Sequence, residues 1–403
     1  MRIALAGNTQ REKDSPTTSD SSGPELTARI HINATKPRAT RSALADHPDA
    51  RPNGTRFLDK LDLYGSEPLS FLLRYDAPWR TFSLDEGFVC YLESRRAAVV
   101  WTDPLCAESE LPALLGAFGR AMRAQHRSVC LLAISERTAQ TAIELGFSAL
   151  KIGEEPWFDL ANWHTLRGNR GKKYRWAANH ARRMGVEIEE YRPGEARNTR
   201  FESEVMDVLG RWRAALKHSE STSFLRAAPF EQAPLKRIFL ARRDGRGEAA
   251  LACAYIPAIE GWYLEDSFRA PDAVNGATEL LISVALERLQ ADGAAGAAFA
   301  MAPMRGFDDQ LDRRARWIGR VVGRAIERVD HHYDFGAMAR YEARFEPSEW
   351  RPRTSPFYRR YRARRRSGLP CESYPLDAVS SRPWPVVPLP CRAEPVPSAG
   401  SVK

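Results

Sequence analysis

The sequence has no long hydrophobic run and no cysteine pattern typical of a metal site. Its longest apolar stretches, such as residues 294–303, are far shorter than the ~20 residues that span a bilayer. The N-terminus has too short an apolar core for a signal peptide. The six cysteines include no CxxC pair and no Cys/His pair at zinc spacing. We therefore expect no metal, no transmembrane segment and free thiols. The expected location is the cytoplasm, and peripheral contact with an anionic membrane is a possible addition to it.

Both ends of the 403-residue chain are poor in periodic apolar residues. Polar residues dominate the N-terminal end, and Arg and Pro dominate the C-terminal end, which predicts disorder at both. Between them, expected strands and helices alternate, which indicates an α/β or α+β fold with a mixed sheet. Two successive runs of meander, helix and strand suggest an internal duplication. The expected division is a disordered segment at 1–56, domains at 57–165 and 166–352, and a tail at 353–403.

Apolar periodicity predicts the individual elements. Helices are expected at 111–126, 138–145, 174–184, 202–216 and 277–289. Strands are expected at 80–84, 87–93, 97–101, 129–134, 186–191, 238–242, 249–256, 262–264 and 297–301. A further strand at 149–160 is expected to be interrupted by Gly153-Glu154-Glu155-Pro156, and residues 219–234 are polar and long enough to form a lid.

Acidic residues are absent from Leu160 to Val186, although this stretch is rich in Lys and Arg. The net charge of +9 also favours an anionic partner. A glycine-containing basic loop that continues into a basic helix can bind a phosphate backbone, and a solvated helix face is the alternative. The candidate tRNA-binding residues of this stretch are Arg167, Arg170, Lys172, Lys173 and Arg175.

Acidic and basic side chains are concentrated between Tyr263 and Glu279. The expected strand ends in Glu265, Asp266 and Arg269, and Asn275-Gly276 precedes the expected helix. Carboxylates can accept an ammonium or a proton, a guanidinium can bind a phosphate, and a helix start favours negative charge. This combination indicates acyl transfer. A surface ion pair followed by a simple turn is the alternative.

Two more segments allow more than one interpretation. Glu154 and Glu155 could bind a ligand ammonium or act as a base, and a solvated bulge is the alternative. The segment Arg242 to Gly247 matches R-x-x-G-x-G, the pyrophosphate loop of acetyl-CoA-dependent acyltransferases. Such a loop must open a helix, whereas a strand pattern follows here, so a hairpin turn is expected.

Several motifs in order resemble the phosphatidylglycerol lysyltransferase C-terminal domain family. They are G-E-E-x-x-x-D-L at 153–160, R-G-N-R-G-K-K-Y-R-W-A-x-N from 167, D-S-F-R at 266–269, N-G-A-T-E at 275–279, A-P-M-R-G at 302–306 and Y-D-F-G-A-M-A-R-Y-E-A-R-F-E-P at 333–347. The resemblance implies two tandem GNAT-like domains. It also implies transfer of an aminoacyl group from aminoacyl-tRNA to an acceptor hydroxyl, without a cofactor.

The resemblance places Asp266 and Arg269 at the catalytic centre and Glu154 and Glu155 near the aminoacyl pocket. Further candidate substrate-binding residues are Glu265, Asn275, Glu279 and Arg305. Arg340 and Arg344 stand where the family's terminal motif carries lysines, and they complete the candidate tRNA contacts.

The acceptor stays open at this stage, because no transmembrane region precedes the matching motifs. A lipid such as phosphatidylglycerol is typical of the family, and a small soluble hydroxyl or hydroxylamine in antibiotic biosynthesis is the alternative. Two different activities also stay open, an acetyl-CoA-dependent acyltransferase and a non-catalytic binder of nucleic acid or membrane. Such a binder would use the Arg-rich cluster at 359–366.

Overall fold

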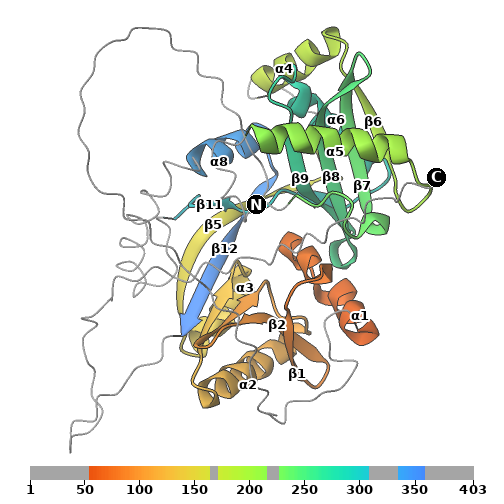
Figure 1. Ribbon diagram of the computed structural model, residues 1–403. Coiled ribbons are helices and arrows are strands. Elements are labelled where there is room, and N and C mark those ends of the chain that lie inside the picture. Colours follow the sequence, from red (N-terminus) through yellow and green to blue (C-terminus); the bar gives the residue numbers. More distant parts are fainter. Residues whose placement is uncertain (1–53, 164–170, 216–226, 308–334, 359–403) are drawn as a thin grey trace, which may run out of the picture.

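The computed structural model describes residues 54–163, 171–215, 227–307 and 335–358, and these build one 12-stranded mixed sheet flanked by helices (Figure 1). The strand order is β1-β2-β3-β4-β12-β5-β10-β9-β8-β7-β6, and β11 pairs with β5. We call residues 54–163 the first half and residues 171–307 the second half. The remaining residues lie outside the described part of the chain.

The first half is a meander followed by a helix and a parallel strand. Its elements are α1 (Thr55–Tyr64), the 3₁₀ helix η2 (Pro68–Arg74), β1 (Arg80–Leu84), β2 (Gly87–Glu93), β3 (Ala97–Trp101), η3 (Glu108–Glu110), α2 (Leu111–Ala124), β4 (Ser128–Leu132), α3 (Glu136–Glu144) and β5 (Ser148–Asp159). Strands β1 to β3 are antiparallel, and β4 lies parallel to β3. Local signals set these boundaries: Ser135 caps α3 by accepting a hydrogen bond from the Thr138 N–H, and Gly146 follows α3 with φ +87°.

The second half repeats this order. Its elements are α4 (Lys172–Arg183), β6 (Glu187–Tyr191), α5 (Thr199–Ala214), η5 (Ala233–Leu235), β7 (Lys236–Arg243), β8 (Arg246–Ile256), η6 (Pro257–Ile259), β9 (Gly261–Arg269), α6 (Ala277–Ala291), β10 (Gly296–Ala298) and β11 (Ala302–Pro303). Strands β7 to β9 form an antiparallel meander, and β10 lies parallel to β9. The expected mixed α/β fold with two similar halves is confirmed.

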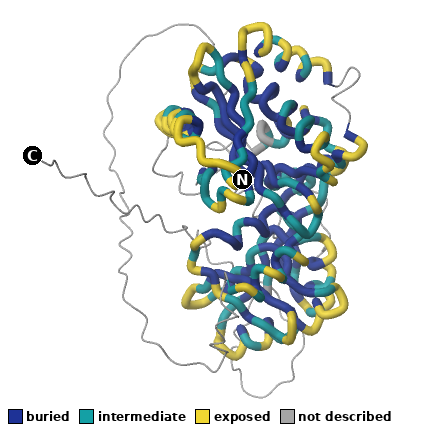
Figure 2. Tube along the Cα trace, turned by 90° about the vertical axis from the view of Figure 1, so that its right-hand side faces the viewer, coloured by how far each residue is buried: buried dark blue, intermediate teal, exposed yellow. Residues whose placement is uncertain are grey.

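The two halves exchange a strand at the centre of the sheet. After α8 (Phe335–Ala343), the last strand β12 (Glu349–Tyr358) returns to the first half and pairs with β4. Strand β5, which belongs to the first half in sequence, pairs instead with β10 of the second half. Because β5 and β12 also pair with each other, the sheet runs without a break from β1 to β6, and buried residues lie along it in both halves (Figure 2).

Strand β5 is continuous, so the expected interruption at residues 153–156 is wrong. Gly153 reflects close strand packing, because a Cβ there would meet the carbonyl oxygen of Ala302 on β11 at 2.4 Å. Pro156 lies between the segments of β5 that pair with β11 and with β10, a position where the strand edge on that side has no partner among the described strands. Gly153 and Pro156 thus reflect how β5 packs and pairs, and they do not interrupt the strand.

Helices cover both faces of the second half. Helices α4 and α6 pack on one face in a core that includes Leu264, Leu281 and Phe299. Helix α5 covers the opposite face over Phe268. Segment η2 of the first half packs against β8 and β9 through Phe71, and so closes the seam between the halves. Within the described ranges, no helix is long and apolar enough to cross a membrane.

Some expectations remain untested or shift. The division into domains at 165/166 stays a prediction. Strand β12 extends to Tyr358, so the expected tail from 353 begins later than predicted. The expected lid lies largely outside the described residues. The four described cysteines are free thiols, as predicted: Cys90, Cys106, Cys130 and Cys253.

The entry to α6 yields a test of the packing. Gly276 has φ +92°, and a Cβ there would lie 2.0 Å from the carbonyl oxygen of Ala177 on α4, whereas Gly293 at the other end of α6 has φ +80° and open space. Gly293→Ala should therefore cost only the left-handed strain, about 1–2 kcal/mol. Gly276→Ala should lower the thermal unfolding midpoint clearly more. Equal midpoints in calorimetry would contradict the close α4–α6 contact.

Candidate active site

A β-bulge places two carboxylates together in the middle of β9. Asp266 pairs with Ala252 on β8 and Leu264 pairs with Cys253, so Glu265 between them has no partner residue. Such an extra residue bends a strand and redirects its side chains. Glu265 and Asp266 are both fully buried. Both carboxylates are linked to Ala228, Asp266 by a direct hydrogen bond and Glu265 through Lys236.

The carboxylate of Glu265 belongs to a buried network that sequence analysis missed. The Lys236 ammonium lies 2.8 Å from it, and the Tyr75 hydroxyl donates a hydrogen bond to it. Lys236 also donates to the Tyr75 oxygen and to the Ala228 carbonyl. The Ala228 N–H in turn donates to Asp266 Oδ2 at 2.8 Å. This chain of bonds fixes both acids against residues from three segments.

The strands diverge next to these acids. Strand β10 pairs with β9 only from Gly261 to Tyr263, so β9 has no strand partner on that side from Leu264 onward within the described ranges. An unpaired strand edge presents N–H and C=O groups. The arrangement therefore places backbone donors and a buried carboxylate side by side, as acyl transfer requires.

Arg269 does not lie with Asp266. It pairs with Ala249, which packs in the core beneath α6, on the opposite face of the sheet. Its charge acts on Tyr341 of α8: burial and Glu279 raise the pKa of the Tyr341 hydroxyl, and Arg269 and Arg344 oppose them. The structure thus groups Arg269 with Glu279 at the first turn of α6, where Arg344 Nη1 lies 3.8 Å from Glu279.

Asn275 lies exposed in the turn that leads into α6. Tyr174 of α4 donates a hydrogen bond to the Glu279 carbonyl, which fixes this end of α6 against α4.

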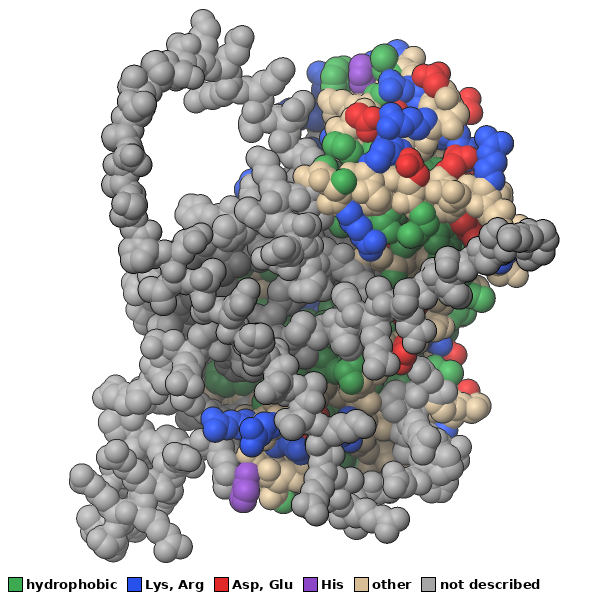
Figure 3. Space-filling model, viewed as in Figure 1, with side chains coloured by type: hydrophobic (Ala, Val, Ile, Leu, Met, Phe, Trp, Pro, Cys, Tyr) green, Lys and Arg blue, Asp and Glu red, His purple; other side chains and the backbone are tan. Residues whose placement is uncertain are grey.

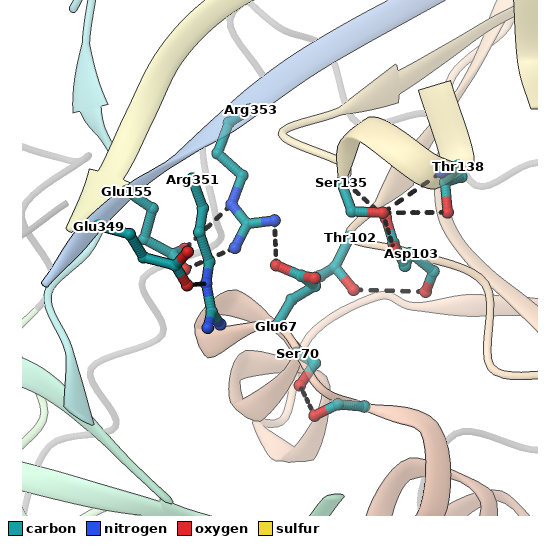
Figure 4. A network of polar contacts seen from close by, with 11 residues as sticks. Glu67, Ser70, Thr102, Asp103, Ser135, Thr138, Glu155, Glu349, Arg351 and Arg353 are labelled. Carbon is teal, nitrogen blue, oxygen red and sulfur yellow. Dashed lines mark hydrogen bonds and ion pairs between the residues drawn. The ribbon is translucent and has the colours of Figure 1, made fainter. Parts of the chain in front are cut away.

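Glu154 and Glu155 both have basic partners, so neither belongs to a solvated bulge. Figure 4 shows Glu155 beside Arg353. Glu155 is buried, and its oxygens lie 2.5 Å and 3.2 Å from the guanidinium nitrogens of Arg353 on β12. Glu154 pairs with Lys151 at 2.7 Å and with Arg305 at 2.9 Å. Neither carboxylate is free to take a substrate ammonium without first losing a partner.

Arg353 also pairs with Glu67, the residue that precedes η2 (Figure 4). Burial raises the pKa of Glu67 to about 8, although Arg353 opposes this shift. Burial likewise raises the pKa of Glu155. Asp103 lies nearby and accepts hydrogen bonds from the N–H and hydroxyl of Ser135. One guanidinium therefore serves two buried carboxylates.

Segment η2 connects the two clusters. Glu67 precedes it and contacts Arg353, and Tyr75 follows it and contacts Glu265. The seven residues of η2 thus span from the β5–β12 pair to the β9 bulge. Both halves of the chain contribute to one polar region along the seam.

The basic stretch forms an exposed face on α4. Lys172, Lys173, Arg182 and Arg183 are exposed, and the described residues offer none of them an ion pair. Helix α5 differs, because its cations pair with acids on the same helix, as in Arg200–Glu204 and Arg211–Asp207. Figure 3 shows basic and acidic side chains interspersed over the second half of the molecule, on the side where α5 lies.

The remaining candidate nucleic-acid contacts are dispersed. Arg167 and Arg170 lie outside the described residues, and Arg175 is half-buried on α4. Arg340 and Arg344 are exposed on and after α8.

The match to R-x-x-G-x-G is a hairpin turn, as predicted. Residues 243–246 connect β7 to β8, so no helix follows them. Within the described ranges, no group of three His, Cys, Asp or Glu side chains could hold a metal ion.

Long-range pairing explains most of what sequence analysis missed. Tyr75, Lys236 and Glu67 contribute through contacts with residues distant in sequence, which no local pattern reveals. Arg353 was assigned to a tail because Arg and Pro surround it. Glu342, within the motif at 333–347, was not singled out. Its only sequence signal was an acidic residue next to Tyr341 in a motif that also carries Phe345.

The buried acid of Glu67 makes stability depend on pH. Its pKa is higher in the folded chain than the ordinary 4.5, so its contribution to stability is full below pH 4.5 and is lost as pH rises toward 8. Glu67→Gln should therefore flatten the fall of the unfolding midpoint between pH 5 and pH 8. The exposed Glu86→Gln should leave that fall unchanged. Parallel curves for Glu67→Gln and the parent protein would contradict the assignment.

Comparisons with known proteins agree with the fold. The sequence matches the family "Phosphatidylglycerol lysyltransferase, C-terminal" over residues 61–354. No curated protein matches it.

Solved structures of other proteins share the fold. The C-terminal domain of a putative lysylphosphatidylglycerol synthetase from Agrobacterium fabrum is 20% identical with a TM-score of 0.61, over 75% of this chain and 90% of that one. L-PGS from Bacillus licheniformis is 18% identical with a TM-score of 0.61, over 76% and 91%. A conserved protein of unknown function from Bacteroides thetaiotaomicron is 11% identical with a TM-score of 0.51, over 72% and 88%. Because the family match covers more than half of the sequence, the chain belongs to the phosphatidylglycerol lysyltransferase C-terminal family, a family of aminoacyltransferases.

Proposed function

We propose that this protein moves an aminoacyl group from aminoacyl-tRNA to an acceptor hydroxyl, with Asp266 at the reacting centre. The observation that carries the proposal is the position of Asp266. Its carboxylate is fully buried at a bulge, beside the point where β9 and β10 diverge. A family of aminoacyltransferases supplies the reaction class.

The chemistry asks little beyond positioning. An aminoacyl ester is already activated, so its transfer to another hydroxyl needs no ATP, and we propose that no cofactor takes part. The enzyme must hold the acceptor oxygen against the ester carbonyl, accept one proton and stabilise the oxyanion. Asp266 accepts the proton from the acceptor hydroxyl as its oxygen bonds to the ester carbon, and returns that proton to the tRNA ribose oxygen as the original ester bond breaks. The unpaired edge of β9 supplies N–H groups for the oxyanion.

The tRNA donor is assigned to the basic face of α4. Its exposed cations lack acidic partners within the described ranges, so they can neutralise phosphates without first breaking ion pairs. Arg269 lies near the same end of α6 that packs on α4, and its guanidinium suits a phosphate of the tRNA 3′ end. Arg269 lies on the opposite face of β9 from Asp266, so the ester of the bound donor must reach Asp266 where β9 and β10 diverge.

For the acceptor we propose the hydroxyl of an anionic lipid, since the family description names phosphatidylglycerol. The protein would then work in the cytoplasm and contact the membrane peripherally. An acetyl-CoA donor receives no support from the fold, because the candidate pyrophosphate loop is the β7–β8 turn.

Replacing Asp266 with asparagine tests the catalytic assignment. Asn keeps an oxygen that can accept from the Ala228 N–H but cannot take a proton, so transfer of labelled aminoacyl groups should fall by about 10² to 10⁴. Binding of the charged tRNA should be unchanged. Asp272→Asn, in the exposed turn after β9, removes the same charge and should retain activity. Full activity of Asp266→Asn would remove this residue from the site.

Replacing Lys172 and Lys173 with alanine tests the donor face. Two lost phosphate contacts should weaken tRNA binding and reduce the slope of log K against log salt by about 1.4–1.8. The matched control is Arg197→Ala with Arg200→Ala, which removes two exposed cations at the start of α5. If both double variants bind alike in filter binding at several salt concentrations, the α4 face is only a solvated surface.

A further inference from the structure

The most unusual polar group in the described part of the chain is Glu342. It lies in the last turn of α8 and is 1% exposed, and neither of its oxygens has a hydrogen-bond partner. Burying a carboxylate without a partner is costly, and native structures rarely retain one without a reason. Its neighbour Tyr341 likewise has a buried hydroxyl without a hydrogen bond. The last turn of α8 thus carries two unsatisfied polar groups in succession.

Tyr341 and Glu342 interact with different charged groups of the candidate site. Tyr341 is acted on by Glu279, Arg269 and Arg344 at the start of α6. Glu342 is acted on by Glu155 of β5 and Arg305 of the loop after β11, and α8 packs on β11. The last turn of α8 therefore places Tyr341 near the start of α6 and Glu342 near the carboxylates of β5.

Within the described ranges, the basic side chains near Glu342 are already engaged. Arg353 is shared by Glu67 and Glu155, and Arg305 is paired with Glu154 and stacked on Trp350 at 3.8 Å. Each of these basic side chains is thus engaged with another group, and Glu342 has no cationic partner among the described residues. A positively charged ligand would supply the missing partner.

We infer that Glu342 binds an ammonium group of the aminoacyl donor. The inference rests on the proposed function, and it replaces Glu154 and Glu155, whose carboxylates are already paired. The ammonium is the α-amino group common to all aminoacyl-tRNAs or the side-chain amine of a basic one. In either case a charge-assisted hydrogen bond forms in a buried site.

Calorimetry with amino acid amides tests the inference without transfer. Alaninamide and lysinamide carry the ammonium, and N-acetylalaninamide lacks it. The parent protein should bind the first two and reject the third, and Glu342→Gln should weaken binding about tenfold to hundredfold, which corresponds to a charge-assisted bond of about 1.5–3 kcal/mol. Binding of lysinamide alone would assign the side-chain amine. Unchanged binding by Glu342→Gln would overturn the inference. The exposed Glu144→Gln at the end of α3 is the control.

A stability measurement separates ligand binding from a structural role. Burial raises the pKa of Glu342 well above 4.5, so the acid costs stability as pH rises above 4.5, and Glu342→Gln should raise the unfolding midpoint at pH 8. A lower midpoint at all pH values would indicate a structural acid and contradict the inference. If the parent protein transfers no aminoacyl group from tRNA, the proposed function is refuted, but the binding and stability measurements still test the role of Glu342.

Discussion

One buried guanidinium fixes the last strand, β12, to the first half of the molecule at the seam of the sheet. Arg353 on β12 pairs with Glu155 on β5 and with Glu67 before η2, and it is 2% exposed. Removing one partner of a buried ion pair leaves an uncompensated charge, which typically costs about 3–5 kcal/mol. Segment η2 connects Glu67 to Tyr75. The ion pair between Arg353 and Glu67 therefore also helps to position the Tyr75 hydroxyl, which contacts Glu265. The seam and the β9 acids therefore depend on each other.

Charge is divided between the two sides of this seam. The interior gathers buried carboxylates around few cations, and the α4 surface presents cations without acids among the described residues. An interior of this kind favours a substrate ammonium and a proton acceptor, and an exterior of this kind favours a polyanion. An aminoacyl-tRNA carries both features, with an ammonium at its 3′ end and phosphates along its backbone. This distribution of charge supports the proposed aminoacyl-tRNA donor.

Local elements could be predicted from the sequence because their signals are local. The meander at 80–101, the helix ended by Gly146 and the hairpin at 243–246 follow from period, cap and turn chemistry. The strand exchange could not be predicted, since β12 is separated from β4 by more than two hundred residues. Gly153 shows the limit well. Its sequence context indicates a break, but the glycine is required by the approach of Ala302.

The site was predicted in part for the same reason. Glu265 and Asp266 were found because they end a strand before a helix, but the bulge that brings them to one face has no sequence signal. Two residues of one motif, Asp266 and Arg269, were expected to act together and lie on opposite faces. Lys236 and Arg353 were missed because only tertiary structure shows that their charges are buried.

The central claim is that an aminoacyl group leaves tRNA in this active site. The most direct measurement is to incubate the purified protein with total tRNA charged with labelled amino acids, with and without a lipid extract, and to follow the label. We expect RNase-sensitive transfer of label into the organic phase, which would also identify the amino acid. Label that stays on every tRNA in the presence of lipid would contradict the claim.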